Sequence, residues 1–213
     1  ANDSQRPLDD APTRDSCQLP EGAFVYCCFN QTFKISAEVF SVWMRLLKTQ
    51  AHSVLWLLEC NPWAKQNLMN AAMAQGVSAD RLVFAPRLPI AEHLARHVHA
   101  DLFLDTLPYN AHTTCSDALW MGLPVLSCVG NTFSARVAGS LLTALDLKEM
   151  VTDNLADYES RASYYASNPE ALLAIKQRLH KQRTTSALFS PAEFARGLEQ
   201  QYQNMWQDGT ASN

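Results

Sequence analysis

Residues 112–117, which read His-Thr-Thr-Cys-Ser-Asp, place an imidazole, two threonine hydroxyls and a carboxylate where a helix is expected to begin. The first N–H groups of a helix have no partner within it, and the helix dipole adds partial positive charge there, so the position favours a phosphate. Asp117 lies one turn further along, where its carboxylate can accept hydrogen bonds from ribose hydroxyls. A capping threonine explains Thr113 or Thr114 alone, but not the whole group. We therefore predict a phosphate site, with simple capping as the alternative.

A second candidate is the stretch Asn-Gln-Thr-Phe-Lys at 30–34, which follows the first apolar segment of the chain. From the opposite side of a diphosphate, the ammonium of Lys34 would stabilise the charge of a leaving group as its bond to phosphate breaks. A single lysine in a loop is more often only solvated. The pattern alone therefore leaves both interpretations of Lys34 open.

A third candidate is Pro-Arg-Leu-Pro at 86–89, followed by Glu92, His93 and Arg96. His93 and Arg96 are three residues apart, so they share one face of a helix. A flat imidazole or guanidinium can stack on a nucleotide base while backbone groups of the loop bind its edge. Without further context, an ordinary surface histidine explains His93 equally well.

Several common kinds of site are missing from the sequence. No GxGxxG follows the first apolar segment, there is no Walker A loop or GxSxG elbow, and no side-chain cluster has metal-ligand spacing, so no metal is expected. The net charge of −4 without a long basic run argues against nucleic-acid binding. No apolar stretch reaches the roughly 18–20 residues of a membrane span. Six cysteines without a pairing pattern favour free thiols and a cytoplasmic location.

The order of apolar segments predicts an α/β fold. The chain has 213 residues, 47% of them apolar, which suffices for one sizeable core. Short, continuous apolar runs are typical of strands buried on both faces, so their alternation with helical segments predicts a Rossmann-like parallel sheet with helices on both faces. Ligands of such sheets bind at the carboxyl ends of the strands. Strands are expected at 23–29, 53–58, 81–84, 100–104 and 124–127, and helices at 36–47, 64–75, 90–97, 113–121, 134–145, 155–166, 169–183 and 191–206.

A series of short motifs runs through the chain in a fixed order. They are Leu19-Pro20-Glu21, Val25-Tyr26-Cys27, Phe29-Asn30-Gln31 with Lys34, 53–58, Glu92-His93, Leu104-Asp105-Thr106, His112-Thr113-Thr114, Asp117, Leu119-Trp120, Gly122 with Pro124, Ser134 with Arg136-Val137-Ala138, Gln182-Arg183 and Met205-Trp206. Together, from about residue 13 to 206, they resemble the C-terminal catalytic lobe of the protein O-GlcNAc transferase family, which includes the SPINDLY-like proteins. Each motif alone is weak, but the ordered series is specific.

The resemblance implies one lobe of a GT-B glycosyltransferase, in which two Rossmann-like lobes face each other across a cleft. It implies that the C-terminal lobe binds a nucleotide sugar, usually UDP-GlcNAc, without a metal ion or other cofactor. A Ser or Thr hydroxyl of an acceptor protein then attacks the anomeric carbon with inversion. Family members bind the acceptor with an N-terminal lobe and TPR repeats, and this sequence shows no 34-residue helical repeat.

We therefore expect a fragment of a longer protein, which alone binds nucleotide weakly and transfers little. Its expected organisation is a linker or tail at 1–20, the nucleotide-sugar-binding lobe at 21–207 and a tail at 208–213. The last helix is expected to cross back onto the lobe that this chain lacks.

On the phosphate side of the donor, the resemblance implies five residues. Lys34 would contact the diphosphate and assist departure of the leaving group, and Gln31 would hold the phosphates and Lys34. His112, Thr113 and Thr114 would bind the diphosphate at the start of the helix.

On the nucleoside side, the resemblance implies that Asp117 holds the ribose. The backbone of Leu88, together with His93 and Arg96, would frame the uracil. These assignments agree with the chemistry inferred from each group of residues.

Two positions depart from the family pattern. Cys115 stands where the best-known members carry glycine, and we expect its larger side chain to shift the start of the helix near the phosphates. Ile90 replaces a lysine of some members and removes a basic contact beside the base. Because SPINDLY-like relatives transfer fucose from GDP-fucose, that donor is an alternative. Another GT-B enzyme, such as a sugar-nucleotide epimerase or an asparagine glucosyltransferase, and a nucleotide-binding interaction module without catalysis are further alternatives.

Overall fold

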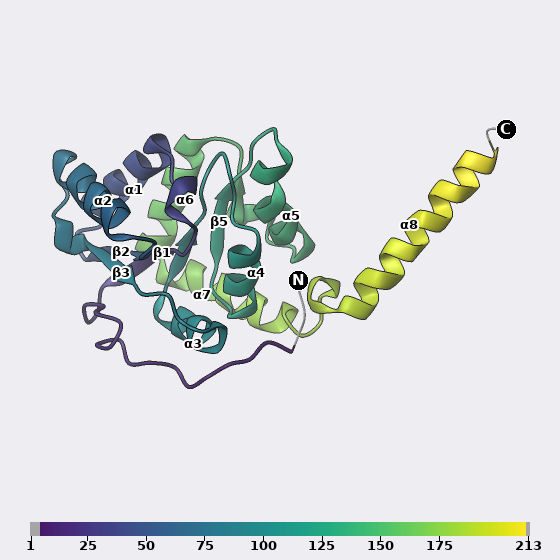
Figure 1. Ribbon diagram of the computed structural model, residues 1–213, viewed down its shortest axis with the longest axis horizontal. Helices are drawn as coiled ribbons and strands as arrows, with labels where there is room; N and C mark the ends of the chain where they lie inside the picture. Colours follow the sequence, from purple (N-terminus) through teal and green to yellow (C-terminus); the bar gives the residue numbers. More distant parts are fainter. Residues whose placement is uncertain (1–4, 212–213) are drawn as a thin grey trace.

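The computed structural model describes residues 5–211 and contains a six-stranded parallel sheet with the strand order β3-β2-β1-β4-β5-β6 (Figure 1). The strands are β1 Phe24–Cys28, β2 Ser53–Leu58, β3 Leu82–Ala85, β4 Leu102–Leu104, β5 Val125–Cys128 and β6 Val151–Thr152. The order reverses between β1 and β4, which pair through Tyr26 with Leu102 and Cys27 with Phe103. The predicted Rossmann-like fold is confirmed.

Helices cover both faces of this sheet. Because parallel crossovers are right-handed, α1 and α2 lie on one face and α3, α4 and α5 on the other. The α-helices are α1 Ala37–Thr49, α2 Pro62–Ala74, α3 Ile90–Ala95, α4 Thr113–Trp120, α5 Val137–Ala144, α6 Leu155–Ser167, α7 Pro169–Gln182 and α8 Pro191–Ala211. Short 3-10 turns occupy Thr32–Lys34, Ala79–Arg81, Arg96–His99, Phe133–Ala135, Lys148–Met150 and Ala187–Phe189.

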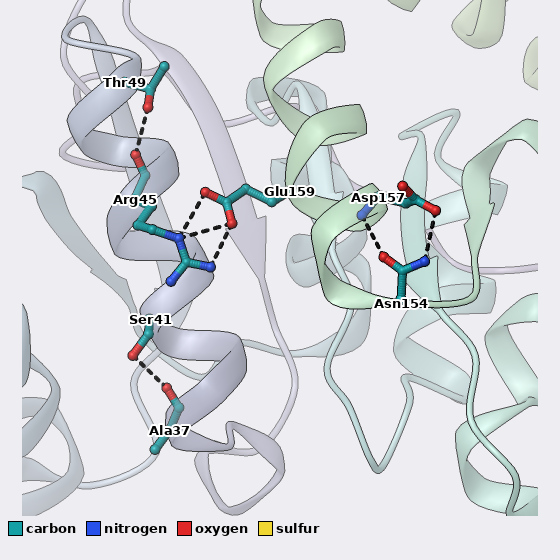
Figure 2. Close-up of polar contacts among 7 residues, drawn as sticks. All are labelled: Ala37, Ser41, Arg45, Thr49, Asn154, Asp157 and Glu159. Atoms are coloured by element: carbon teal, nitrogen blue, oxygen red, sulfur yellow. Dashed lines mark hydrogen bonds and ion pairs between the residues drawn. The ribbon is translucent and has the colours of Figure 1, made fainter.

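Helix α6 returns to the first face and packs beside α1. Figure 2 shows the ion pair between the Arg45 guanidinium of α1 and the Glu159 carboxylate of α6, in which Nη2 lies 2.6 Å from Oε2. The Asn154 side chain caps α6 by accepting from the backbone N–H of Asp157 at 2.8 Å, which satisfies one orphan donor of the helix start. The ion pair connects α6 to α1 at the surface, and the cap stabilises the start of α6 itself.

A buried chain of hydrogen bonds connects this helix pair to the end of β4. The indole of Trp43 in α1 donates to the hydroxyl of Tyr158 in α6 at 3.2 Å. That hydroxyl donates to the carbonyl of Asp105, directly after β4, at 3.0 Å. These buried hydrogen bonds therefore anchor the loop after β4, which lies at the end of the sheet where ligands of such folds bind.

Two expectations about individual elements are wrong. The strand β6 was not expected, because two residues are too short to give a periodic signal. The single helix expected at 134–145 is instead a 3-10 turn followed by α5. Arg136, with φ −126° and ψ −8°, interrupts the helical backbone between them.

The two ends of the described chain differ, because the N-terminal segment lies along the compact body and the C-terminal helix projects away from it. The segment after residue 5, expected to be a linker, runs along the lobe past α3 before it enters β1 (Figure 1). Helix α8 projects away from the sheet, with Phe194 69% and Trp206 74% exposed. Within residues 5–211, none of the helices has the length and apolar character needed to cross a membrane.

Candidate functional site

A pocket of about 470 Å³ opens at the carboxyl ends of the strands, beside the point where the strand order reverses between β1 and β4. Open α/β sheets bind their ligands at this position, because the loops there diverge to opposite faces. The residues around the pocket are Phe29, Asn30, Gln31, Lys34, Leu58, Arg87, Leu88, His93, Arg96, Tyr109, His112, Thr113, Thr114 and Asp117.

All nine residues predicted to form the donor site border this one pocket. They come from three segments that the fold brings together: the loop after β1, the segment from β3 into α3, and the loop after β4 with the start of α4. The structure therefore unites the three groups of residues singled out in the sequence. The roles assigned to them individually stay predictions.

The start of α4 at this pocket has no side-chain cap. His112 occupies the N-cap position with φ −108° and ψ −89°, and its side chain makes no capping hydrogen bond. The hydroxyl of Thr114 donates to the side-chain oxygen of Asn30, and Thr113 is exposed. Simple capping by a threonine is therefore wrong as an explanation of this motif. The positive end of α4 is left at the pocket for another acceptor.

Asn30 links the loop after β1 to the loop after β4. Its side chain is 2% exposed, and its amide nitrogen donates to the hydroxyl of Thr106 at 2.8 Å and to Asp105 Oδ1 at 3.4 Å. Its amide oxygen accepts from Thr114. Since Asn30 directly precedes Gln31, this network holds the two sides of the pocket in a fixed relation.

Lys34 brings a positive charge to the pocket. Its ammonium donates to the carbonyl of Asn110 at 2.9 Å and lies 3.8 Å from the centre of the Tyr109 ring, a cation–π contact. Within the described chain Lys34 forms no ion pair. Burial lowers its pKa, and the charge of Asp105 opposes that shift. The ammonium is thus partly desolvated and held by neutral groups, so an anion entering the pocket would gain a strong partner.

Gln31 lies on the same side, but its side chain bonds to partners other than Lys34. Its side-chain oxygen accepts from Arg87 Nη2 at 3.1 Å and from the Cys60 thiol at 3.4 Å, whereas Lys34 bonds to the Asn110 carbonyl. Gln31 contacts Lys34 through the backbone, where the Lys34 N–H donates to the Gln31 carbonyl at 3.0 Å, and the expected role of its side chain at the phosphates stays a prediction. The Gln31 side chain also places a second cation, Arg87, at the pocket.

Arg96 is buried, with 1% of its surface exposed, and lies 4.8 Å from the centre of the Phe29 ring. Its guanidinium donates to the Pro86 carbonyl at 2.7 Å and to Nδ1 of His93. The guanidinium is thus held by protein groups although Arg96 borders the pocket, and the expectation that Arg96 helps to frame the uracil stays a prediction. Arg96 also acts on the pocket through His93, whose Nδ1 accepts a hydrogen bond, so that the proton of the neutral ring sits on Nε2.

Two neighbouring histidines are kept neutral here. Burial is the main cause that lowers the pKa of His93 to about 3, and the neighbouring His97 and Arg96 add to it. Burial also lowers the pKa of His97 to about 4, although Nδ1–H of His97 donates to the His93 carbonyl at 2.8 Å. An unfolded chain takes up protons on both side chains near pH 6.5, but the folded protein does not.

We expect His97 to make the stability of the fold depend on pH. Between pH 6.5 and about 4 the unfolded state binds a proton that the folded state excludes, so the free energy of unfolding falls as the pH falls. Relative to that of His97→Asn, the free energy of unfolding of the wild type should fall by about 1.4 kcal/mol for each pH unit below 6.5. Above pH 6.5 the difference between the two should not depend on pH. Urea titrations from pH 4 to 8 measure this difference.

The exposed His52 supplies the control variant for that series, His52→Asn. If the free energies of unfolding of wild type and His97→Asn differ by a constant amount between pH 4 and 7, His97 takes up its proton in the folded state as readily as in the unfolded state, which would contradict the prediction.

Of the two departures from the family pattern, Cys115 does not shift the helix start as expected, and the effect of Ile90 on the base stays a prediction. Cys115 is fully buried and points into the core rather than at the pocket, so its side chain does not intrude on a bound phosphate. Helix α4 still begins at Thr113. Ile90 is half exposed at the start of α3, where its apolar side chain borders solvent.

Asp117 borders the pocket and has 7% of its surface exposed. Its carboxylate forms an ion pair with Arg6, far away in the sequence. Burial raises the pKa of Asp117, and the Arg6 guanidinium opposes that effect. Oδ1 of this carboxylate is therefore paired within the protein, while the residue still borders the cavity.

Sequence reasoning missed four residues of this site, namely Asn30, Arg87, Tyr109 and Arg6. The position of Asn30 directly after a buried strand was a usable signal, because polar side chains at strand ends face the ligand crevice. Arg87 lies in the Pro-Arg-Leu-Pro stretch that was singled out without a role for the arginine, whereas Tyr109 lies between the motifs at 104–106 and 112–114. No signal pointed to Arg6, since its contact spans more than a hundred residues of sequence.

The fold and the pocket together define a Rossmann-like lobe of the GT-B class of glycosyltransferases. The fold is similar to that of sucrose-phosphate synthase from Thermosynechococcus elongatus, with a TM-score of 0.63 and 15% identity over 93% of this chain and 50% of that one. At that identity the likeness concerns the fold alone. The sequence is more specific: the chain belongs to glycosyl transferase family 41, whose sequence profile matches residues 9–198.

Individual relatives agree with this assignment. The chain is 37% identical over 196 residues to SEC of Arabidopsis thaliana, a probable UDP-N-acetylglucosamine–peptide N-acetylglucosaminyltransferase, over 92% of this chain and 20% of that protein. It is 31% identical to the Caenorhabditis elegans UDP-N-acetylglucosamine–peptide N-acetylglucosaminyltransferase, over 91% and 17%. A lysine-to-methionine mutant of Thermobaculum terrenum O-GlcNAc transferase superposes with a TM-score of 0.85 and 29% identity, over 97% of this chain and 39% of that one. The chain thus spans about a fifth of the curated relatives it matches.

Proposed function

We propose that this chain is the donor-binding lobe of a protein O-glycosyltransferase that transfers GlcNAc from UDP-GlcNAc to serine or threonine, with inversion and without a metal ion. The observation that carries the proposal is the pairing of an uncapped helix start with the ammonium of Lys34 at one pocket. Both elements favour an anion, and they border the same cavity at the ligand-binding end of the sheet. The names of the relatives supply the choice of UDP-GlcNAc.

In the proposed complex the diphosphate lies between α4 and Lys34. His112 and the backbone N–H groups of Thr113 and Thr114 contact the phosphates. The hydroxyl of Thr114 is already donated to Asn30, so this side chain orients the loop rather than the ligand.

The nucleoside occupies the other part of the pocket. Asp117 accepts from the ribose hydroxyls, and Leu88 with His93 borders the base. His93, neutral and donating from Nε2, offers one hydrogen bond to a carbonyl of the base. Arg96 supports this side indirectly by fixing the His93 ring.

The chemical step we propose is attack of the acceptor hydroxyl on the anomeric carbon, with the nucleoside diphosphate as leaving group. Negative charge grows on the oxygen of the β-phosphate as the bond to the sugar breaks. The Lys34 ammonium and the dipole of α4 stabilise that charge in a partly desolvated site, where such electrostatic effects are large. The acceptor would be bound by parts of the full-length protein outside this chain, so the isolated lobe should bind nucleotide but transfer little.

Isothermal titration of the folded chain with UDP, GDP and uridine tests the proposal. We expect UDP to bind, uridine to bind much more weakly because it lacks the diphosphate, and EDTA to leave UDP binding unchanged. Tighter binding of GDP than of UDP would instead favour a GDP-fucose donor. The absence of binding to either diphosphate by a sample with native circular dichroism would contradict the proposal.

The cellular setting that we propose is a compartment that keeps thiols reduced, such as the cytoplasm. All six cysteines are free thiols, and Cys27, Cys28, Cys115 and Cys128 are buried. Free, buried cysteines are typical of reducing compartments.

A further inference from the structure

The segment before the lobe is attached to its surface at several points. The imidazole Nε2 of His99, at the end of the turn after α3, lies 2.6 Å from the carbonyl of Pro12. Closer to β1, the Arg14 guanidinium donates to the carbonyls of Pro20, at 2.9 Å, and Ala23. These contacts lead the chain past α3, as Figure 1 shows, so that residue 6 arrives beside α4.

Arg6 enters a site built from two aromatic rings and two polar side chains. Its guanidinium forms an ion pair with Asp117, and Nη2 donates to the hydroxyl of Ser116 at 2.7 Å. The rings of Trp120 and Phe189 each lie 5.7 Å from the guanidinium carbon. The side chains of Arg6 and Asp117 are 8% and 10% exposed. This is a buried, multiply fixed contact rather than a surface ion pair of little consequence.

The same Asp117 borders the donor pocket. A carboxylate has two oxygens, and Arg6 engages Oδ1. That contact sets the rotation of the carboxylate and leaves Oδ2 to accept a hydrogen bond from a ligand. Without a cation beside it, a carboxylate buried this deeply would tend to bind a proton or turn away toward water.

We propose that Arg6 is a positioning residue of the donor site, which holds the Asp117 carboxylate in the orientation that accepts the ribose hydroxyls. The segment before the lobe is then a part of the nucleotide site rather than a passive linker. The inference rests on the proposed function, because it assigns the ribose to Asp117.

The test compares Arg6→Gln with wild type by isothermal titration with UDP and with 2′,3′-dideoxy-UDP. Arg6→Gln should weaken UDP binding about tenfold, the usual order for losing a well-placed hydrogen bond to a charged group. It should leave binding of the dideoxy analogue unchanged, since that ligand has no hydroxyl for Asp117. Arg6→Lys, which keeps the charge, should restore part of the affinity for UDP.

Arg14→Gln is the matched control, because Arg14 fastens the same segment without touching Asp117. A second measurement needs no nucleotide: carbon NMR titration should show a higher pKa for Asp117 in Arg6→Gln than in Arg14→Gln. Equal effects of the two variants, equal losses for UDP and its dideoxy analogue, or tighter UDP binding by Arg6→Gln would each overturn the role of Arg6. A wild-type protein that binds no UDP would refute the proposed function itself.

Discussion

Replacing Lys34 by methionine should weaken UDP binding about 10- to 100-fold and leave uridine binding unchanged. In the wild type the ammonium is partly desolvated, donates to the Asn110 carbonyl and lies over the Tyr109 ring. A diphosphate offers it a charged partner in place of these neutral ones. Methionine keeps the length and apolar contacts of the side chain but has no charge, so the loss should be confined to ligands that carry phosphate. Isothermal titration of both ligands measures this.

In the full-length protein the same change should reduce kcat about 10²- to 10³-fold, the cost of removing one donor from a site where negative charge develops. Lys48→Met provides the control, because Lys48 lies at the exposed end of α1 and donates to the Gln75 carbonyl at 3.2 Å. UDP affinity within twofold of wild type in Lys34→Met would mean that this lysine faces away from the bound diphosphate.

The sheet could be predicted because its signal is local. Strands buried on both faces read as unbroken apolar runs, such as 53–58, in which every residue of β2 is buried. Once the strands are parallel and their order reverses at β1 and β4, the loops that follow them must meet. The grouping of Lys34 with Thr114 around one pocket therefore follows from topology, without any knowledge of side-chain contacts.

The contacts within the site could not be predicted, because their partners are far apart in sequence. Thr114 reads as a helix cap, but its hydroxyl donates to Asn30, 84 residues away. His93 and Arg96 share a helix face as expected, yet which of them is open to the pocket depends on how α3 packs over Phe29. Arg6 lies in a polar, proline-containing stretch that looks like a linker and becomes a buried partner only after folding. Local patterns carry no information on these choices.

Asp105 should be the residue at this site whose loss destabilises the fold most. It is 2% exposed and accepts from the Ser127 hydroxyl at 2.6 Å and from the backbone N–H groups of Ala111 at 2.6 Å and Thr106 at 2.8 Å. Asp105→Ala leaves these buried donors without an acceptor and removes a partner of Asn30. We expect the free energy of unfolding to fall by about 3–5 kcal/mol and Tm by roughly 10 °C. Urea and thermal unfolding measure both quantities.

The exposed Asp80 gives the control, since Asp80→Ala removes a carboxylate at the surface and should change stability by less than about 0.5 kcal/mol. A loss below about 1 kcal/mol in Asp105→Ala would mean that water or a shifted loop replaces the carboxylate with ease.

Asp105→Asn separates the shape of this carboxyl from its charge. The amide oxygen can keep the backbone donors, and the amide nitrogen can donate to Ser127 after its hydroxyl rotates, so the variant should fold normally.

Burial raises the pKa of Asp105 to about 7, although Ser127, Ala111, Thr106 and Asn30 donate to it. Between pH 4 and 7 the folded wild type keeps a proton that the unfolded chain has lost, so its stability falls as the pH rises. Relative to Asp105→Asn, that decrease should reach about 1.4 kcal/mol per pH unit. The side chain also connects Asn30 to the loop before α4. The terminal phosphate of UDP titrates near about pH 6, so the informative quantity is the ratio of the UDP affinities of wild type and Asp105→Asn, in which the ligand's own titration cancels. We expect this ratio to change between pH 4 and 7 because the network positions the phosphate site, and a ratio independent of pH would mean that Asp105 only stabilises the fold.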